Sequence, residues 1–172
     1  MVKTINDITQ LKDEAWGICA TVMDPEIPVL SVTDLGIVRN IEVFDNKQSI
    51  TITITPTYSG CPAMDAIAMN LRMAFLSHGY KEVNIHSVLS PAWTTDWISL
   101  EGRDKLKAYG IAAPNPIQPV CDNEYFSMQQ AVQCPRCNSY HTKLISQFGS
   151  TACKALYKCE SCDEPFDYFK CH

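Results

Sequence analysis

Two pairs of cysteines near the C-terminal end constrain the fold of this chain more than any other feature. They stand in the stretches QCPRC (133–137) and KCESC (158–162), with 21 residues between the inner cysteines. Two cysteines three positions apart in a tight turn can direct both sulfurs at one ion, and two such turns facing each other across a hairpin complete a tetrahedron. We therefore predict a zinc ribbon over residues 131–172. Its predicted Zn²⁺ ligands are Cys134, Cys137, Cys159 and Cys162.

This tail of about 40 residues is too small to fold by apolar burial alone, whereas a structural zinc contributes roughly 10–16 kcal/mol in comparable peptides. Four thiolates leave no open position for water or substrate, so the metal would be a scaffold. Iron or an iron–sulfur cluster on the same sulfurs stays open as an alternative. A redox dithiol is disfavoured because no thioredoxin-like strand and helix surround the pairs. Cys153, Cys171 and His172 could substitute for a ligand, form a second soft-metal site or simply pack, and we favour packing or supporting roles for them. We assign no role to Cys121.

Composition excludes several classes of function. The chain has 172 residues, 46% of them hydrophobic and 19% charged, which suits one ordinary domain plus a small one. The chain has a net charge of −5, and its charged residues are spread along the sequence without a run of like charges. We therefore expect neither nucleic acid nor an anionic membrane as a partner. The N-terminus lacks the apolar stretch of a signal peptide, and no run approaches the ~18 apolar residues of a membrane span. We expect a cytoplasmic protein, in which nine cysteines are not a disulfide framework.

Hydrophobic periodicity predicts an α/β fold for the first part of the chain. Apolar residues recur at helical spacing over residues 7–23, and Cys19 falls among them as a core residue. A strand is predicted over 38–44, followed by a turn and a strand in which isoleucine and threonine alternate over 50–55. The two strands form a predicted hairpin with one buried face.

A second predicted helix runs from Pro62 to about His78 and ends at Gly79, before a strand over 82–89. A strand, a helix and a strand in succession imply a right-handed crossover and a parallel pair. The predicted fold is thus a small mixed sheet packed with helices, built from a hairpin plus a strand-helix-strand unit. The four-cysteine zinc ribbon follows it.

We predict three parts along the chain. An α/β domain spans residues 1–110 and closes with a short helix that ends at Gly110. Residues 111–130 carry three prolines and no lysine or arginine, which predicts an extended linker. The ribbon spans residues 131–172.

The stretch TPTYSGCP (55–62) places one thiol between a strand that has ended and a helix that is starting. Pro62 fits the first turn of a helix, so Cys61 stands at the N-cap or beside it. Unpaired N–H groups and the helix dipole stabilise an anion there, which predicts a lowered pKa for Cys61. The opposing interpretation, a small buried cap residue, is equally compatible with the sequence. Hydroxyl donors around the sulfur are available from Thr55, Thr57, Tyr58 and Ser59.

Three carboxylates, Asp24, Glu26 and Asp34, lie in the loop after the first predicted helix. They are either turn residues or hard ligands near the thiol, and the Leu35-Gly36 that follows favours a turn for Asp34. No histidine is tied to Cys61, which weakens hydrolase and acyltransferase interpretations, so we expect no catalysis by this chain alone. A single accessible thiolate can still ligate iron transiently if another protein supplies the remaining ligands.

Three of these motifs carry a resemblance to known proteins. The stretches DPE (24–26), DLGIV (34–38) and TPTYSGCP (55–62) resemble the domain shared by SufT and the targeting subunit of cytosolic iron–sulfur assembly, over roughly residues 8–110. The tail resembles the end of the PaaD family, accessory proteins of the bacterial phenylacetyl-CoA oxygenase. Together, in this order, they fit the PaaD family along nearly the whole chain. The resemblance implies an α/β fold and makes Cys61 the reactive cysteine. The motif residues it carries over beside the thiol are Asp24, Glu26 and Asp34.

What the resemblance implies is a role in aerobic phenylacetate breakdown. There, a di-iron oxygenase forms the ring 1,2-epoxide of phenylacetyl-CoA, fed by a reductase with flavin and a plant-type iron–sulfur cluster. This sequence has no E-x-x-H pair, no glycine-rich nucleotide loop and no ferredoxin cysteine run, so it is neither component. We interpret it as a factor that helps install the cluster in the reductase or keeps that subunit assembled, with Cys61 as a transient iron–sulfur ligand.

The implied partners are the reductase subunit and the oxygenase subunits, and a homodimer stays open. Two other classes of function also stay open. A purely structural subunit would use the zinc module to grip a partner without transferring metal. A thiol enzyme would need a small-molecule substrate and a base near Cys61.

Overall fold

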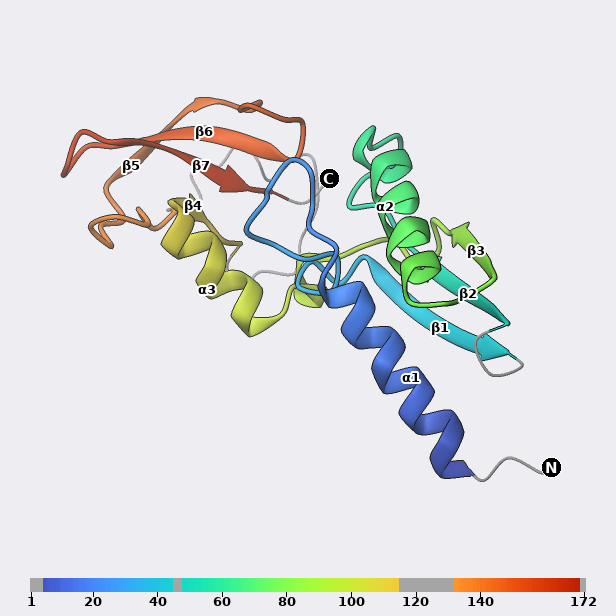
Figure 1. Cartoon of the computed structure of the whole chain (residues 1–172). Helices are drawn as coiled ribbons and strands as arrows, with labels where there is room; N and C mark the ends of the chain where they lie inside the picture. Colours follow the sequence, from blue (N-terminus) through green and yellow to red (C-terminus); the bar gives the residue numbers. More distant parts are fainter. Residues whose placement is uncertain (1–4, 45–47, 115–131, 171–172) are drawn as a thin grey trace. The chain divides into compact units, whose positions relative to one another are not determined.

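The computed structural model describes residues 5–44, 48–114 and 132–170 of the chain (Figure 1). The chain divides into two compact units, Met1–Trp93 and Thr94–His172. In the described residues, no helix has the length and apolar character needed to cross a membrane.

The first unit is a three-stranded mixed sheet with two helices. Its strands lie in the order β1-β2-β3; β1 runs antiparallel to β2, and β2 runs parallel to β3. The predicted hairpin and strand-helix-strand unit are therefore confirmed. The elements are α1 (Ile5–Ala20), β1 (Val38–Phe44), β2 (Ser49–Ile54), α2 (Ala63–Ser77) and β3 (Glu82–Ser87).

The central strand β2 sets the core of this unit. Its isoleucines, Ile50, Ile52 and Ile54, are at most 1% exposed, while its threonines point to the other face and are half-buried. Helix α1 packs on β1, α2 packs on β3, and the two helices contact each other, so both cover the isoleucine face. Alternation along one strand thus decides which face of the sheet is covered.

Two helix ends differ from the predicted ones. Helix α1 stops at Ala20, three residues before the predicted end. After it, the Thr21 hydroxyl donates to the Ile18 carbonyl at 2.7 Å, and Met23 forms a β-bridge with Ser31 in place of continuing the helix. Helix α2 begins at Ala63, with Pro62 at its N-cap, and Gly79 follows its end with φ +88°. That positive φ favours glycine, as the predicted stop signal requires.

The second unit is a four-stranded sheet preceded by a helix. The sheet order is β4-β7-β6-β5; β4 runs parallel to β7, and the other pairs are antiparallel. Helix α3 is capped by the Ser99 hydroxyl, which accepts from the Gly102 N–H at 2.9 Å, and ends at Gly110 as predicted. The elements are the 3-10 helix η1 (Thr95–Trp97), α3 (Leu100–Tyr109), β4 (Ile111–Ala112), β5 (Thr142–Ser146), β6 (Lys154–Cys159) and β7 (Pro165–Phe169).

The sequence did not predict β4. Ile111 and Ala112 are buried and pair with β7 at the edge of the ribbon sheet, although the predicted linker begins at residue 111. Pro114 follows too soon for a longer strand, since proline donates no ladder hydrogen bond. The rest of that linker, from residue 115, lies outside the described residues. The predicted division into a domain (1–110), a linker (111–130) and a ribbon (131–172) concerns which parts fold independently, and it stays a prediction.

An aromatic cluster forms the core of the ribbon. The ring of Tyr157 stacks on Phe166 with centroids 5.9 Å apart and meets Tyr168 edge-on at 5.7 Å. Beside it, the buried Lys154 ammonium lies 3.7 Å from the Asp167 carboxylate. The loop between β5 and β6 packs tightly over this pair, because a Cβ on Gly149 would lie 2.8 Å from Asp167 Oδ1.

Gly149→Ala should therefore destabilise the ribbon by about 1–3 kcal/mol, since the added methyl has to displace the Asp167 carboxylate that pairs with the buried Lys154 ammonium. Gly17→Ala is the matched control: nothing lies within 4 Å of its Cβ position, and it should stabilise α1 by about 0.5–1 kcal/mol. Urea unfolding followed by hydrogen exchange on peptides of each unit measures both effects. Equal stability of the Gly149→Ala and wild-type ribbons would contradict the close packing.

Candidate functional site

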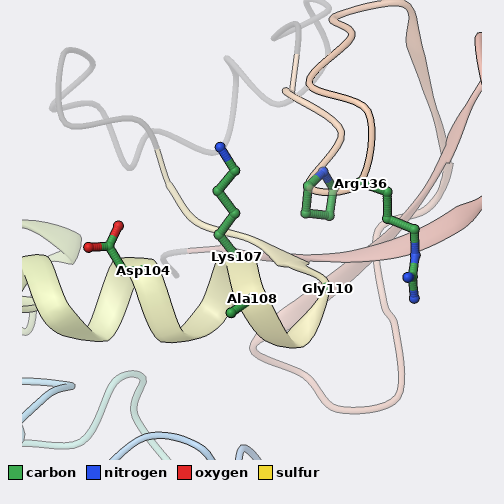
Figure 2. A pocket seen from close by; sticks show the side chains of 6 residues that line it. Asp104, Lys107, Ala108, Gly110 and Arg136 are labelled. Carbon is green, nitrogen blue, oxygen red and sulfur yellow. The ribbon is translucent and has the colours of Figure 1, made fainter.

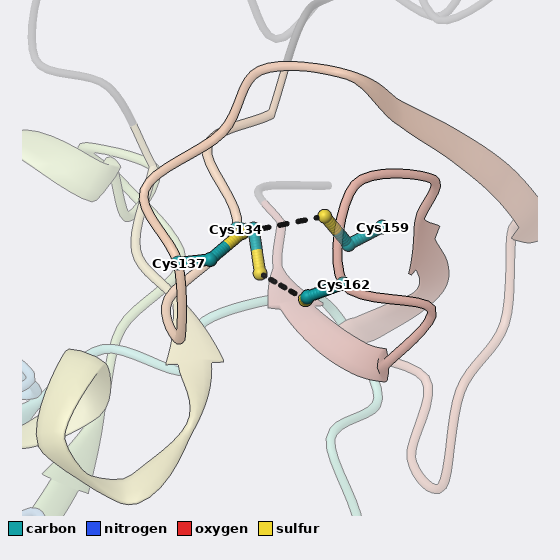
Figure 3. Close-up of side chains that lie close together, drawn as sticks. All are labelled: Cys134, Cys137, Cys159 and Cys162. Carbon is teal, nitrogen blue, oxygen red and sulfur yellow. Dashed lines mark hydrogen bonds between the residues drawn. The ribbon is translucent and has the colours of Figure 1, made fainter.

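The four predicted metal ligands come together at one end of the ribbon (Figure 3). Their sulfurs all lie within 4.8 Å of one another. Across the two turns, Cys134 Sγ is 3.8 Å from Cys162 Sγ, and Cys137 Sγ is 3.5 Å from Cys159 Sγ. The second turn follows β6 and the first precedes β5, so the antiparallel pairing of these strands brings the turns together.

This spacing fits a tetrahedral zinc ion. Zinc–sulfur bonds of about 2.3 Å in a tetrahedron place the sulfurs about 3.8 Å apart. An all-thiolate set of four is also the donor chemistry that zinc takes in structural sites. The four-cysteine cluster and the ribbon fold predicted from the sequence are confirmed.

Each turn is followed by a residue in the left-handed conformation, a feature that the sequence analysis missed. Asn138 after the first pair has φ +60°, and Asp163 after the second has φ +61°. Asparagine and aspartate adopt this conformation more readily than other residues with side chains. A left-handed residue directly after C-x-x-C reverses the chain and turns the two sulfurs inward. The available signal was the presence of asparagine and aspartate at these two equivalent positions.

The environment of the cluster favours at least one thiolate. Burial raises the pKa of Cys159, but the N–H groups of Cys162 and Ser161 and the thiols of Cys137 and Cys162 outweigh it and lower that pKa to about 6. Backbone N–H groups inside the second turn therefore stabilise the charged form that a metal requires.

The remaining described cysteines of the two units are packed residues, apart from Cys61. Cys19 is fully buried in α1, and burial raises its pKa to about 12, which confirms its predicted core role. Cys153 is 4% exposed, its sulfur lies 3.0 Å from the Thr151 hydroxyl, and it stands outside the four-sulfur cluster. Cys121, Cys171 and His172 lie outside the described residues.

Cys61 directly precedes the N-cap of α2 and is half-buried. Pro62 at the N-cap offers no side-chain acceptor, so the first turn of the helix has N–H groups to share. The Cys61 sulfur takes one of them, accepting from the Ala63 N–H and from the Tyr58 side chain. Cys61 therefore lies beside the start of the helix, as predicted. Of the hydroxyl groups considered as donors, the one that acts on the sulfur is that of Tyr58.

The pKa of Cys61 moves in the direction opposite to the expected one. Burial raises it most, the two hydrogen bonds lower it, and the negative charges of Glu26 and Asp24 raise it further. The N–H and hydroxyl donors are thus outweighed by desolvation and by two carboxylates that come from a different loop. A pKa above the ordinary value of a thiol means that Cys61 keeps its proton at neutral pH.

The carboxylates of the motif are first of all turn residues. Asp24 Oδ1 accepts from the N–H groups of Glu26 and Ile27 at 2.8 and 2.7 Å. Asp34 Oδ2 accepts from the Ser31 N–H at 3.0 Å and from the Ser31 hydroxyl at 2.8 Å, which confirms its predicted turn role. Both aspartates are 7% exposed, so their buried charges fix the path of the loop between α1 and β1.

These residues do not form a second metal centre by themselves. Among the residues that the structure describes, the four ribbon cysteines are the one group of three or more metal-binding side chains at ligand distance from each other. Asp24, Glu26 and Asp34 therefore do not join Cys61 in a preformed ligand set. Two histidines of this unit lie at the end of α2 and exposed on β3. They are His78 and His86.

A cavity of about 470 Å³ lies elsewhere, between the end of α3 and the first cysteine turn (Figure 2). Arg136 Nη2 lies 3.5 Å from where a Cβ of Gly110 would stand, so its guanidinium covers the C-cap of α3. Lys107 and Arg136 point in different directions and do not converge on a ligand (Figure 2). We assign this cavity no chemistry. It is lined by Asp104, Lys107, Ala108, Gly110, Pro135 and Arg136.

Comparison with known proteins assigns both parts of the chain. Residues 119–170 match a family profile described as the PaaD zinc beta ribbon domain, and residues 12–86 match one described as an iron–sulfur cluster assembly protein. The chain is 48% identical over 158 residues, 92% of each chain, to an Escherichia coli K12 protein whose name makes it one of the subunits of 1,2-phenylacetyl-CoA epoxidase.

A second relative matches about half of the chain. It is the Fe-S protein maturation auxiliary factor of Porphyromonas gingivalis, 38% identical over 56% of this chain and 90% of its own. A crystal structure of DUF59, a domain of unknown function from Bacillus anthracis, superposes on 60% of this chain and 97% of its own with a TM-score of 0.55 at 21% identity. That structural likeness confirms the predicted α/β fold.

Replacing a ribbon ligand should remove the metal. Purified wild-type protein should carry about one zinc per chain, and Cys137→Ser should lose most of it and unfold the ribbon, because three thiolates bind zinc far more weakly than four. Cys153→Ala is the control, since its sulfur lies outside the cluster and its loss should leave the zinc content unchanged. Metal analysis by mass spectrometry measures the zinc-to-protein ratio. Equal zinc in the Cys137→Ser and wild-type proteins would contradict the assignment. Iron instead of zinc in the wild-type protein would support the alternative of iron or an iron–sulfur cluster on the same sulfurs.

Glu26→Gln should lower the pKa of Cys61, because it removes a negative charge that opposes the thiolate. Alkylation of Cys61 at pH 8 should accordingly be faster in Glu26→Gln than in the wild type, and both rates should rise with pH above 8. Mass spectrometry of the Cys61 peptide after iodoacetamide treatment follows this residue alone. Glu42→Gln, a carboxylate change on β1, serves as the control. A slower reaction in Glu26→Gln would show that Glu26 does not act on the thiol through its charge.

Proposed function

The chain belongs to the PaaD family of phenylacetyl-CoA epoxidase subunits, and on that premise we propose that it is an iron–sulfur maturation factor for the reductase of that system. Its first unit would take up an iron–sulfur cargo transiently on Cys61 and release it to the reductase. The zinc ribbon would stay closed around its own metal and serve as scaffold. The E. coli relative bears the epoxidase name, and the P. gingivalis relative bears the maturation name, so the proposal joins the roles that the two names state.

The observation that carries this proposal is the incompleteness of the Cys61 site. One half-buried sulfur stands at a helix start, and it belongs to no group of three or more metal-binding side chains among the described residues. An iron atom of a cluster takes four ligands, so a single protein sulfur holds a cluster only while other molecules supply the rest. A site of this kind favours transfer over storage, in contrast with the complete set of four in the ribbon.

The raised pKa of Cys61 fits such a transfer. In the protein without cargo the thiol keeps its proton, and a protonated thiol is less prone to oxidation than a thiolate. On uptake, the Cys61 sulfur would replace one thiolate of the donor on the cargo iron, and its proton would pass to that departing thiolate. On release, a thiol of the reductase would replace Cys61 on the iron and give its proton to the Cys61 sulfur. The carboxylates of Glu26 and Asp24, which oppose a bare thiolate, attract the cationic iron, so their effect changes sign with the cargo.

The test expresses the reductase in cells that carry the wild-type protein, Cys61→Ser or no copy of this gene. Cys61→Ser should lower the iron and acid-labile sulfide of the purified reductase to the level of the deletion, because serine cannot replace the thiolate as a ligand. Ser59→Ala, an exposed change two residues away, is the control and should match the wild type.

The other outcomes separate the alternatives. Full cluster content in both Cys61→Ser and the deletion would contradict maturation. Loss of cluster in the deletion alone, with Cys61→Ser unaffected, would support a scaffold that keeps the reductase assembled. Turnover of a small molecule by the purified protein alone would identify a thiol enzyme.

A further inference from the structure

Thr55 is the first residue of the segment that carries Cys61, and backbone hydrogen bonds connect it to the other two motif segments of the first unit. It follows the last residue of β2, and its N–H donates to the Ile37 carbonyl at 2.9 Å. Ile37 in turn donates to Val32, and Val32 to Val22, so backbone hydrogen bonds tie Thr55 to the loop that carries both buried aspartates. Six residues further along the chain stands Cys61. Thr55 is thus placed where the carboxylate loop and the segment that carries the Cys61 thiol meet.

The hydroxyl of Thr55 is buried without a hydrogen-bond partner. The residue is 1% exposed, and no described residue donates to or accepts from its Oγ1. The half-buried Thr51 and Thr53 on the same strand differ in this respect, since water reaches their face of the sheet. A buried hydroxyl with no partner is less favourable than a methyl group in the same place. Folding alone would thus favour valine, which has the same branching and a higher strand propensity.

We propose that Thr55 is a positioning residue of the Cys61 site, whose hydroxyl gains its hydrogen bond when an iron–sulfur cargo binds. This inference rests on the proposed function. Loading turns the Cys61 thiol into a thiolate and brings the sulfides of the cluster, so anionic sulfur acceptors are present only in the loaded state. The Ala63 N–H and the Tyr58 side chain already donate to the Cys61 sulfur before loading, and Thr55 adds the donor that is still unused.

A donor of this kind controls how long the cargo stays. Hydrogen bonds to the sulfurs of a cluster stabilise their negative charge, and such supporting contacts typically change metal affinity or activity by about 10–100-fold. Before loading, the same hydroxyl contributes nothing to Cys61, so it does not lower the thiol pKa ahead of the cargo. Thr55 would therefore act on the loaded state alone.

The experiment compares Thr55→Val, Thr55→Ser and Thr53→Val in the cellular reductase assay and in the purified full-length protein. In Thr55→Val the initial rate of cluster appearance in newly induced reductase should fall about tenfold. Its unfolding midpoint should be unchanged or higher, and the alkylation rate of its Cys61 should equal that of the wild type. Thr55→Ser keeps the hydroxyl and should restore most of the delivery rate. Thr53→Val makes the same chemical change at a half-buried position and should deliver like the wild type.

Each other outcome overturns the inference. A lower unfolding midpoint in Thr55→Val would show that the hydroxyl already has a partner before loading, a water molecule included. Wild-type delivery by Thr55→Val, or failure of Thr55→Ser to restore it, would show that the hydroxyl has no role in loading. If Cys61→Ser is impaired and Thr55→Val is not, only the role of Thr55 fails. If Cys61→Ser itself delivers normally, the proposed maturation function fails.

Discussion

The alternation of isoleucine and threonine along β2 is the constraint on which the first unit depends. This strand pairs with both neighbours, antiparallel with β1 and parallel with β3, and its buried isoleucines receive both helices on one face. Because side chains alternate with a period of two, a slip of one residue would turn the core outward, so the register is strongly fixed. The end of β2 leads directly into Thr55 and then Cys61, and the position of the thiol follows from the register of the sheet.

The loop between α1 and β1 combines a structural and an electrostatic role in the same carboxylates. Asp24 is buried because two backbone N–H groups satisfy it, and a charge so held is costly to displace. Burial raises the pKa of the Cys61 thiol most, and the charge of Asp24 together with that of Glu26 raises it further. The motif DPE therefore acts on the thiol at a distance through charge, without supplying ligands to a preformed centre.

Local patterns were enough to predict most of the fold and the metal ligands. The β1 strand, the stop of α2 at Gly79 and the four-cysteine cluster follow from period, turn chemistry and spacing, which act within short stretches of chain. The pairing of Ile111 with β7 was not predictable, because its partner lies more than 50 residues away and nothing local marks it. The pKa of Cys61 was missed for a related reason. The helix start is visible in the sequence, but burial and the charges of Asp24 and Glu26 reach the sulfur only through tertiary structure.

The two kinds of sulfur site in this chain differ in the number of ligands that the fold holds in place. In the ribbon, two turns fix four sulfurs at the spacing of a tetrahedron, so releasing a bound metal would require all four bonds to break and would also cost the stability that the metal gives the fold. At Cys61 the fold positions one sulfur and two donors to it, so the bond to iron that we propose there could break without unfolding anything. On the proposed function, the number of ligands and their coupling to folding would make the ribbon retain its metal and Cys61 release its cargo, although both sites bind through sulfur.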